Sequence, residues 1–591
     1  MAVALAGGAG AASASAATLY VSPPPDGSDA NDCMTPATAC ATIQHAVEEA
    51  APGNTIEVGP GAYEEIVSVT KSLTLNGAQA GIDARDRTGA PESVLNESGG
   101  GFVVTAPDVT IDGFTVEGVS GLPFGAAIYL SHSHSGYRVA NNVVRDNVLG
   151  LYANTSGATP SLVERNRFEA NNRPGSASGS AIYADHGSHD LTIVANLFTG
   201  HESAAVNLAG ADQSQITVSD NELVDDNSIV FFNTEDATVS GNISTDSRGS
   251  TIFLGGGNAG IAVEANRLVD SATSAVRVVD LFAGPNQDVD VIRNVISGNE
   301  FGVRVDDAAS SGPLDVHGNS IAGNGVGAQT GDPDPGDAID AAENWWGCNE
   351  GPGQPGCDTA SSGVTADPWL VLTASADRAS VGIGETATVT AALDRTSDGA
   401  PASLPVADTV PAFFTAARGA VAPAVATFGA GVAASTYSAS GGAGDAGIAV
   451  TVDDETVPVA LSVTDPAVSP PAGLTPPPPD PEPLVESAAR RTIAAGAKPV
   501  IATIACPDRR CVVFDKLSLL KVDGEHRRLK VLVAQRIPGG GSAKVRVYLR
   551  RPVREALREA NRGRLIVMLT VADDDGDELP VMETVELKPK T

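Results

Sequence analysis

The stretch Ile193-Val194-Ala195-Asn196-Leu197-Phe198 decides the fold of this 591-residue chain, because its pattern recurs many times. An apolar residue is followed three positions later by asparagine, and a second apolar residue usually comes two positions after that. The copies, of which the one at Asn242 is weaker, have their asparagines at Asn142, Asn166, Asn196, Asn221, Asn242, Asn266, Asn294 and Asn319. Successive asparagines are 24, 30, 25, 21, 24, 28 and 25 residues apart, and Asn344 follows after 25 more. A period of this length is typical of one coil of a β-solenoid.

The residues around each asparagine predict strands. β-Branched residues alternate with others on both sides of the asparagine, and the spacing is too short for a helix-turn-helix repeat. Leucine-rich repeats are the nearest alternative, but they need leucine at fixed positions, and leucine is scarce here. Asparagine suits a corner between strands because it tolerates left-handed backbone geometry and because its amide can bond to the amide one coil above. We therefore expect a structural ladder that takes no part in catalysis.

The residues before the repeats predict a cap for the first coil. Cys40–Ala51 has the pattern of a short amphipathic helix, with Ile43, Ala46, Val47 and Ala50 on one side. Asn54–Val58 then opens the first strand. A cap of this kind keeps the open end of a solenoid from pairing with another chain.

Two groups of motifs resemble right-handed parallel β-helix repeat proteins of the pectin-lyase-like superfamily. The opening motifs are Cys40–Gln44, Asn54–Tyr63 and Leu73–Ala78, and the closing motifs are Glu343–Cys348 and Asp367–Leu370. The resemblance covers about 350 residues and implies the fold. It does not imply one activity, because the superfamily contains lyases, hydrolases, epimerases, adhesins and proteins without known activity.

The predicted fold class is all-β, with a single-stranded parallel β-helix followed by two smaller domains. The β-helix is expected over residues 18–370. Alternating segments over 371–465 predict a small β-sandwich that resembles bacterial immunoglobulin-like domains. A proline-rich linker is expected over 466–483 and a basic, β-rich C-terminal domain over 484–591.

Charge and cysteines indicate where the protein works. The last 108 residues carry 21 basic and 14 acidic side chains, whereas the first 483 carry 16 basic and 58 acidic ones, a net charge of −42 that argues against binding nucleic acid. The six cysteines form three local pairs, which predicts three small disulfide loops and an oxidising compartment. The pairs are Cys33/Cys40, Cys348/Cys357 and Cys506/Cys511.

The N-terminal segment over residues 1–17 is apolar and ends in small residues, like the cleavage region of a secretory signal, although it lacks a basic start. No stretch of 18 apolar residues appears elsewhere, so no transmembrane helix is predicted. We expect a secreted or cell-surface protein, and a monomer.

In each coil, a second strand follows the asparagine corner. The alternation of apolar and variable residues in that strand assigns one position that faces outward. Five of these nine positions are aromatic, although only 4% of the chain is aromatic. The positions are Tyr129, Tyr152, Tyr183, Asn207, Phe231, Phe253, Arg277, Arg304 and Gln329. Two residues further along, the same face is expected to carry Ser131, Asn154, Asp185, Ala209, Asn233, Gly255, Val279, Asp306 and Gly331.

This face is the predicted ligand-binding surface. Exposed aromatic rings stack on sugar rings, and neighbouring polar groups bond to hydroxyls, so a polysaccharide or cell-wall glycan is the expected partner. Stacking that only stabilises the sheet, and burial under a loop or a partner, are the alternatives. The residues assigned to binding are Tyr129, Tyr152, Asn154, Tyr183, Asn207, Phe231, Asn233 and Phe253.

Two groups on the face are candidates for catalysis. Asp185 and His186 combine an acid and a base beside the tyrosines, whereas Arg277, Arg304 and Asp306 contain two arginines that could clamp a carboxylate. The resemblance makes a polysaccharide lyase or epimerase acting on uronates the alternative function. A non-catalytic surface scaffold or adhesin is a second alternative.

Calcium is the one cofactor for which the sequence offers candidate sites. Acidic loops lie at Asp26–Asp32 and Asp573–Glu578, but neither has the spacing of a helix-loop-helix calcium site. Solvated turns are the alternative explanation for both loops, so no cofactor is assigned.

Overall fold

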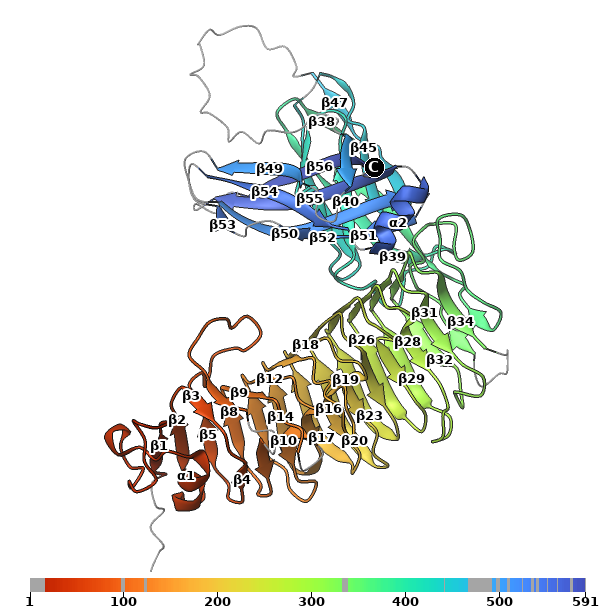
Figure 1. Cartoon of the computed structure of the whole chain (residues 1–591). Coiled ribbons are helices and arrows are strands. Elements are labelled where there is room, and N and C mark those ends of the chain that lie inside the picture. The colour runs from red at the N-terminus through yellow and green to blue at the C-terminus, as the bar shows by residue number, and fades with distance from the viewer. Residues whose placement is uncertain are drawn as a thin grey trace, which may run out of the picture. The chain divides into compact units, whose positions relative to one another are not determined.

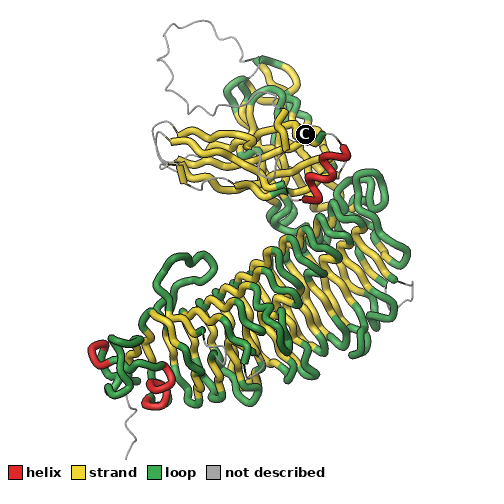
Figure 2. Tube along the Cα trace, viewed as in Figure 1, coloured by secondary structure: helices red, strands yellow, loops and turns green. Residues whose placement is uncertain are grey.

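The structure is a computed structural model that describes residues 16–589 except 97–100, 122–124, 332–337, 441, 466–491, 496–499, 507–510, 523–524, 533–535, 538–540, 550, 561 and 574–577. Most of the signal-like segment and the predicted linker over 466–483 lie outside the described residues. The N-terminal part is a parallel β-helix, as predicted, in which strands stack coil upon coil (Figure 1). Loops join the strands at the corners of the spiral (Figure 2).

Three parallel sheets run along the spiral, named here sheets A, B and C. Sheet A contains β1 (Thr18–Val21), β2 (Thr55–Val58), β5 (Thr74–Asn76), β8 (Thr110–Asp112), β11 (Arg138–Ala140), β14 (Thr155–Glu164), β17 (Ser188–Val194), β20 (Gln213–Ser219), β23 (Thr234–Ser240), β26 (Ala259–Glu264), β29 (Gln287–Ile292), β32 (Leu314–His317), β35 (Ile339–Asp340) and β36 (Val364–Thr365). Sheet B contains β3 (Gly61–Tyr63), β6 (Ser93–Leu95), β9 (Phe114–Glu117), β12 (Val143–Arg145), β15 (Arg167–Glu169), β18 (Leu197–Thr199), β21 (Glu222–Val224), β24 (Ile243–Thr245), β27 (Arg267–Val269), β30 (Val295–Ser297) and β33 (Ser320–Ile321). Sheet C contains β4 (Val67–Val69), β7 (Phe102–Val104), β10 (Ala126–Leu130), β13 (Leu149–Ala153), β16 (Ser180–Ala184), β19 (Ala204–Leu208), β22 (Ser228–Phe231), β25 (Ile252–Leu254), β28 (Ser274–Val278), β31 (Phe301–Val305) and β34 (Val326–Thr330).

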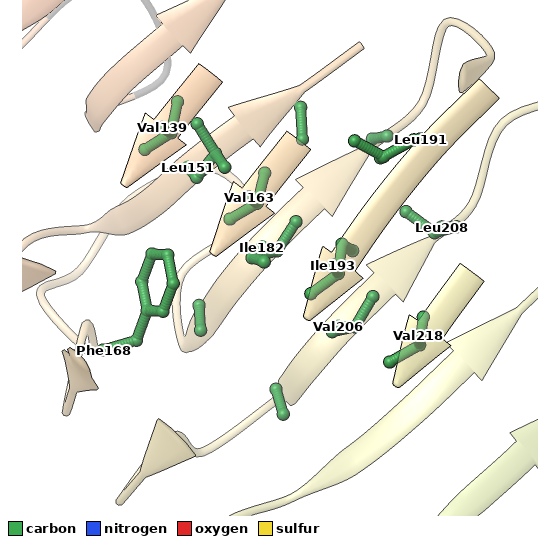
Figure 3. Close-up of a cluster of buried hydrophobic side chains, with 14 of the residues drawn as sticks. Val139, Leu151, Val163, Phe168, Ile182, Leu191, Ile193, Val206, Leu208 and Val218 are labelled. Carbon is green, nitrogen blue, oxygen red and sulfur yellow. The ribbon is translucent and has the colours of Figure 1, made fainter. Parts of the chain in front are cut away.

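The core lies inside the spiral and consists of apolar columns. Val163 pairs in register with Ile193, and Ile193 with Val218, so equivalent side chains of sheet A stack along the axis (Figure 3). Leu151 and Ile182 form a matching column in sheet C. All five residues belong to one buried cluster, and removing this apolar surface from water is the main stabilisation of each coil.

The predicted asparagine ladder is confirmed at the corner between sheets A and B. The Oδ1 atom of Asn166 accepts hydrogen bonds from the backbone N–H and the Nδ2 of Asn142, and this pattern continues from coil to coil as far as Asn344. The expected left-handed geometry lies one residue earlier, for example at Arg165 with φ 52° and Ala195 with φ 55°. The asparagine therefore serves the corner through its amide rather than through its own backbone conformation.

Both ends of the spiral are closed. At the start, α1 (Ile43–Glu49) buries the side predicted to be apolar, next to η1 (Pro36–Thr38) and the disulfide between Cys33 and Cys40. At the far end, Trp345 and Trp346 are fully buried, and Cys348 is bonded to Cys357. Two of the three predicted disulfides are thus present. The side chains of Cys506 and Cys511 lie outside the described residues.

The first compact unit extends beyond the predicted boundary at residue 370. It comprises the chain to Val371 and also Asp394–Thr409. This later segment is attached to the last coils, because Arg293 Nη2 lies 2.6 Å from Asp408 Oδ2 and the Ala407 N–H donates to the Gly318 carbonyl. The sequence alone gave no sign of this return.

The remaining described residues form smaller, mainly antiparallel sheets. The first group contains β37 (Leu370–Ala376), β38 (Ser380–Gly382), β39 (Thr386–Thr396), β40 (Pro411–Thr415), β41 (Ala420–Ala422), β42 (Val425–Thr427), β43 (Val432–Ser438), β44 (Gly444–Asp445), β45 (Ile448–Val452), β46 (Glu455–Val459) and β47 (Ser462–Thr464). The second contains β48 (Thr492–Ala495), β49 (Val500–Cys506), β50 (Cys511–Val522), β51 (Glu525–Arg528), β52 (Lys530–Leu532), β53 (Arg536–Ile537), β54 (Gly541–Tyr548), α2 (Arg551–Ala560), β55 (Gly563–Asp573) and β56 (Glu578–Pro589). The resemblance of the first group to immunoglobulin-like domains stays a prediction.

Candidate functional site

The outward face of sheet C carries the column that the alternation predicted. The strand register aligns residues of nine successive coils, and eight of the nine assigned positions are correct. The aligned residues are Tyr129, Tyr152, Tyr183, Asn207, Val230, Phe253, Arg277, Arg304 and Gln329.

The assignment of Phe231 to this face is wrong. Phe231 pairs with Leu208 and is 0% exposed, so its ring fills the core, while Val230 takes the outward position. The strand contains the uninterrupted apolar run Ile229–Phe232, in which alternation gives no signal. Because Val230 rather than Phe231 faces outward, Asn233 does not lie in the column of outward residues predicted two positions further along each strand. Asn233 forms a left-handed turn at φ 48°, and its Nδ2 donates to the Gly210 carbonyl.

The tyrosines of three neighbouring coils form one stack. The rings of Tyr129 and Tyr152 are parallel, with centroids 5.0 Å apart, and Tyr152 lies 6.2 Å from Tyr183. Tyr152 is only 2% exposed and forms a small buried cluster with Ala126 and Leu149, against which Tyr129, Tyr183 and Ala177 pack. The prediction of a solvent-facing ring is therefore wrong for Tyr152, whereas Tyr129 and Tyr183 are partly exposed.

A polar group lies directly beside this stack. The Tyr152 hydroxyl donates to Asp185 Oδ1 at 2.5 Å and lies 2.9 Å from His186 Nδ1. His186 Nδ1 is 2.7 Å from the same carboxylate oxygen, and its side chain is 53% exposed. The ring of His132 stacks against His186 with centroids 5.2 Å apart. We call Tyr129, Tyr152, Tyr183, His132, Asp185 and His186 the tyrosine–histidine cluster.

The hydroxyl of Tyr152 is held in its protonated form. Burial and the nearby Asp185 carboxylate, which accepts its hydrogen bond, raise the pKa of Tyr152 above its ordinary range. Burial also raises the pKa of Tyr183. At neutral pH both hydroxyls keep their protons, and the hydroxyl of Tyr152 acts as a hydrogen-bond donor and not as a base.

Asn154 stabilises this cluster through hydrogen bonds to its backbone. Its side chain is 0% exposed, so the expectation that it faces solvent is wrong. Its Oδ1 accepts hydrogen bonds from the backbone N–H groups of Asp185 at 3.2 Å and His186 at 2.9 Å. Asn154 thereby fixes the turn that presents both side chains. Asn207 keeps its predicted outward position in the column.

The arginine group is also brought together, but its charges are already paired. Arg277 Nη2 lies 2.6 Å from Asp306 Oδ2, and Arg304 Nε lies 2.9 Å from Asp306 Oδ1. The carboxylate of Asp306 thus takes the place between the arginines that a substrate carboxylate would need. Four coil steps of about 4.8 Å separate Arg277 from Tyr183, so the two candidate groups are about 19 Å apart and form separate sites.

A second ladder went unpredicted, although the sequence carries a signal for it. Every repeat asparagine from Asn142 to Asn319 is followed five positions later by another polar residue at the corner between sheets B and C. These residues are Asn147, Asn171, His201, Asp226, Ser247, Ser271, Asn299 and Asn324. His201 and Asp226 are fully buried within it, and His201 Nδ1 lies 2.6 Å from Asp226 Oδ2.

An exposed aromatic ring was also missed. Phe282 is 78% exposed and stacks on Phe232, with centroids 5.1 Å apart and an interplanar angle of 11°. It lies in a loop after β28, where strand alternation does not apply. Phe232 in turn lies near Phe253 of the outward column, at 6.4 Å.

The first acidic loop holds its carboxylates in backbone contacts. Asp29 accepts hydrogen bonds from the N–H groups of Ala41 and Thr42, and Asp32 accepts one from Met34. These hydrogen bonds indicate that Asp29 and Asp32 stabilise the turns of the loop. The second loop, Asp573–Glu578, lies largely outside the described residues.

Comparisons with known proteins agree with the fold. Residues 61–223 match the family described as "Right handed beta helix region", and residues 207–334 match the family described as "Periplasmic copper-binding protein (NosD)". The chain is a right-handed parallel β-helix repeat protein. A comparison with curated proteins yields no significant match. No helix among the described residues is both long and apolar enough to cross a membrane.

Solved structures with similarity to the chain share little sequence with it. The adhesin InvE of Yersinia pseudotuberculosis is 18% identical with a TM-score of 0.14, and the match covers 36% of this chain and 58% of the adhesin. A mannuronic acid specific polysaccharide lyase from human gut microbiota is 11% identical, with a TM-score of 0.33 and coverage of 50% and 81%. The A-module of the Azotobacter vinelandii mannuronan C-5 epimerase AlgE6 is 13% identical, with a TM-score of 0.27 and coverage of 51% and 92%.

The copper named in the second family description does not fit the residues present. The matched stretch 207–334 contains His317 as its single histidine and has neither cysteine nor methionine. The soft ligands that Cu⁺ prefers are therefore lacking in that stretch. We derive no copper chemistry for this protein.

Proposed function

We propose that this protein is a secreted or cell-surface β-helix protein that binds polysaccharide at the tyrosine–histidine cluster on sheet C. The observation that carries the proposal is the convergence, on one outward face, of exposed imidazoles, partly exposed tyrosine rings and a carboxylate from three neighbouring coils. The two disulfides support an oxidising, extracytoplasmic location.

The cluster suits a sugar ring because it combines flat apolar faces with polar groups. The rings of His132 and His186 are solvent-accessible, and Tyr183 is partly exposed, so a sugar can stack there without a change of backbone. Asp185 and His186 offer acceptors and donors to sugar hydroxyls. Tyr152 contributes indirectly, since its hydroxyl fixes Asp185 and His186.

Glycan-array binding by the full chain tests the proposal. We expect His186→Ala and Tyr183→Ala each to weaken binding roughly tenfold, which corresponds to about 1.4 kcal/mol for a lost stacking or hydrogen-bonding contact. Thr217→Ala, an outward residue of sheet A, is the matched control and should bind as the unaltered protein does. Equal binding by all variants would remove the cluster from the proposal.

A uronate-directed polysaccharide lyase or epimerase is the second candidate, favoured by one observation. Tyr152, Asp185 and His186 lie within hydrogen-bonding distance of one another, as an acid–base site requires. Two observations count against it: the raised pKa of Tyr152 disfavours its use as a base, and Asp306 already pairs the arginines.

Incubation with a panel of uronate polysaccharides distinguishes binding from lysis. A lyase creates an unsaturated product that absorbs ultraviolet light, so absorbance is followed with and without calcium. We expect no increase on any substrate. An increase that Tyr152→Phe abolishes would replace binding by catalysis as the function of the cluster. Failure to bind any glycan would instead leave the scaffold or adhesin alternative.

A further inference from the structure

The last coils carry a set of metal-ligating side chains on the outward face of sheet A, away from the tyrosine–histidine cluster. In β32 the burial alternates, so Asp315 and His317 project outward from one strand two positions apart. Asp340 of β35 pairs directly with Asp315. One ligand atom from each of Asp315, His317 and Asp340 lies within 4.8 Å of the other two.

The imidazole of His317 is oriented as a ligand. Its Nδ1 lies 2.8 Å from the carbonyl oxygen of Ala342, which can only accept a hydrogen bond. Nδ1 therefore carries a proton, and in the neutral imidazole the lone pair then lies on Nε2. A histidine that ligates a metal ion characteristically donates its other N–H to a carbonyl or carboxylate in this way.

The two carboxylates lack a cationic partner. Among the residues that the structure describes, no lysine or arginine nitrogen lies within 4.0 Å of Asp315 or Asp340, whereas arginines pair some other acidic groups of the spiral, such as Asp112 and Asp306. Asp290, in register with Asp315 on the preceding coil, adds a third negative charge.

We propose that Asp315, His317 and Asp340 bind Zn²⁺. Two carboxylate oxygens and one imidazole nitrogen form a common ligand set for Zn²⁺, with the solvent side left for water. Ligand atoms around tetrahedral Zn²⁺ are about 3.4 Å apart, and the exposed side chain of Asp315 can rotate to close the remaining gap. Ca²⁺ and Mg²⁺ prefer all-oxygen sites and bind here more weakly.

Isothermal titration of the metal-free full chain with Zn²⁺ tests the site. We expect His317→Ala, Asp315→Asn and Asp340→Asn each to reduce the affinity on the order of 10- to 100-fold. Glu264→Gln is the matched control, because Glu264 occupies the same outward column as His317 two coils away. Its affinity should equal that of the unaltered protein.

Two further measurements keep the result independent of folding defects. Zn²⁺ should raise the Tm of the unaltered protein and of Glu264→Gln but not that of His317→Ala. Co²⁺ should give a visible absorption spectrum that changes when His317 is replaced by glutamine. Unchanged Zn²⁺ affinity in a variant lacking all three ligands would overturn the proposal, as would a Co²⁺ spectrum that does not depend on His317.

Discussion

Asn196 illustrates how one side chain joins three coils. Its Oδ1 accepts hydrogen bonds from Asn166, and its Nδ2 donates to the Val163 carbonyl at 2.9 Å and to Asn221 Oδ1 at 3.0 Å. The residue is fully buried, so water cannot replace a lost partner. Each ladder amide therefore supports its neighbours as well as its own corner.

Asn196→Ala should destabilise the β-helix by about 3 kcal/mol, because it leaves several buried donors and acceptors unsatisfied. Urea unfolding followed by circular dichroism measures this loss. Thr217→Ala, on the outer face of the next coil, should change the midpoint little. If both variants unfold at the same urea concentration, the ladder contributes less than its hydrogen bonds indicate.

His201 occupies the second ladder in place of an amide. Its Nε2 lies 3.0 Å from the Nδ2 of Asn171, which donates, and its Nδ1 lies 2.6 Å from Asp226. His201→Ala would leave the buried carboxylate without this donor, so we expect a loss of about 3 to 5 kcal/mol. Replacing both His201 and Asp226 by asparagine should restore much of that loss. Thermal unfolding of the single and double variants checks the comparison.

Residue-scale prediction from sequence succeeded where side chains alternate and failed where they do not. The outward positions of Tyr129, Tyr183 and Arg304 followed from the period of two, whereas Phe231 lies in an apolar run that carries no phase information. The burial of Tyr152 could not be predicted either, because it depends on Ala177 of a loop and on rings of neighbouring coils.

At the scale of elements, parallel register places like residues beside one another. In sheet A this puts the carboxylate of Asp290 next to Asp315. Because the pKa of Asp290 is raised on folding, its charged form costs stability above that pKa, and the cost disappears as the pH falls through it. The element therefore carries a small electrostatic penalty at neutral pH.

Asp290→Asn should accordingly stabilise the metal-free protein at pH 7, by less than about 1 kcal/mol since the group is exposed. The advantage should be smaller at pH 4, because the raised pKa of Asp290 favours the protonated carboxyl group as the pH falls. Urea midpoints at both pH values, with Thr238→Ser as a non-titrating control, measure the difference. A stabilisation equally large at pH 4 would point to a cause other than charge.

At the scale of the whole molecule, the strands of each coil pair only with those of the neighbouring coils, so stability depends on how the ends are closed. The disulfide between Cys33 and Cys40 spans a sequence separation of seven residues at the capped end. The cap was predictable from the apolar face of α1. The return of Asp394–Thr409 to the last coils was not, because it rests on contacts such as Arg293 with Asp408 between distant segments.

Replacing Cys33 and Cys40 by serine should destabilise the first coils by about 2 to 3 kcal/mol. Hydrogen exchange should quicken in α1 and β2 while the coils around Asn266 remain protected, because loss of the cap opens the spiral from its end. In the matched variant lacking Cys348 and Cys357, hydrogen exchange should instead quicken in the last coils while the first coils remain protected. A uniform loss of protection along the chain would contradict the expectation that the spiral opens from one end while the other coils stay folded.

The unequal coil lengths have an evolutionary consequence. Successive ladder asparagines are separated by as few as 21 and as many as 30 residues, yet the columns of sheet C stay aligned because the surplus falls in the loops. Insertions at the corners can therefore accumulate without disturbing the face, and a substitution on the face does not disturb the core. Such a chain can exchange or duplicate a single coil and keep the alignment of its neighbours, so under the proposed binding role the ligand preference would change one coil at a time.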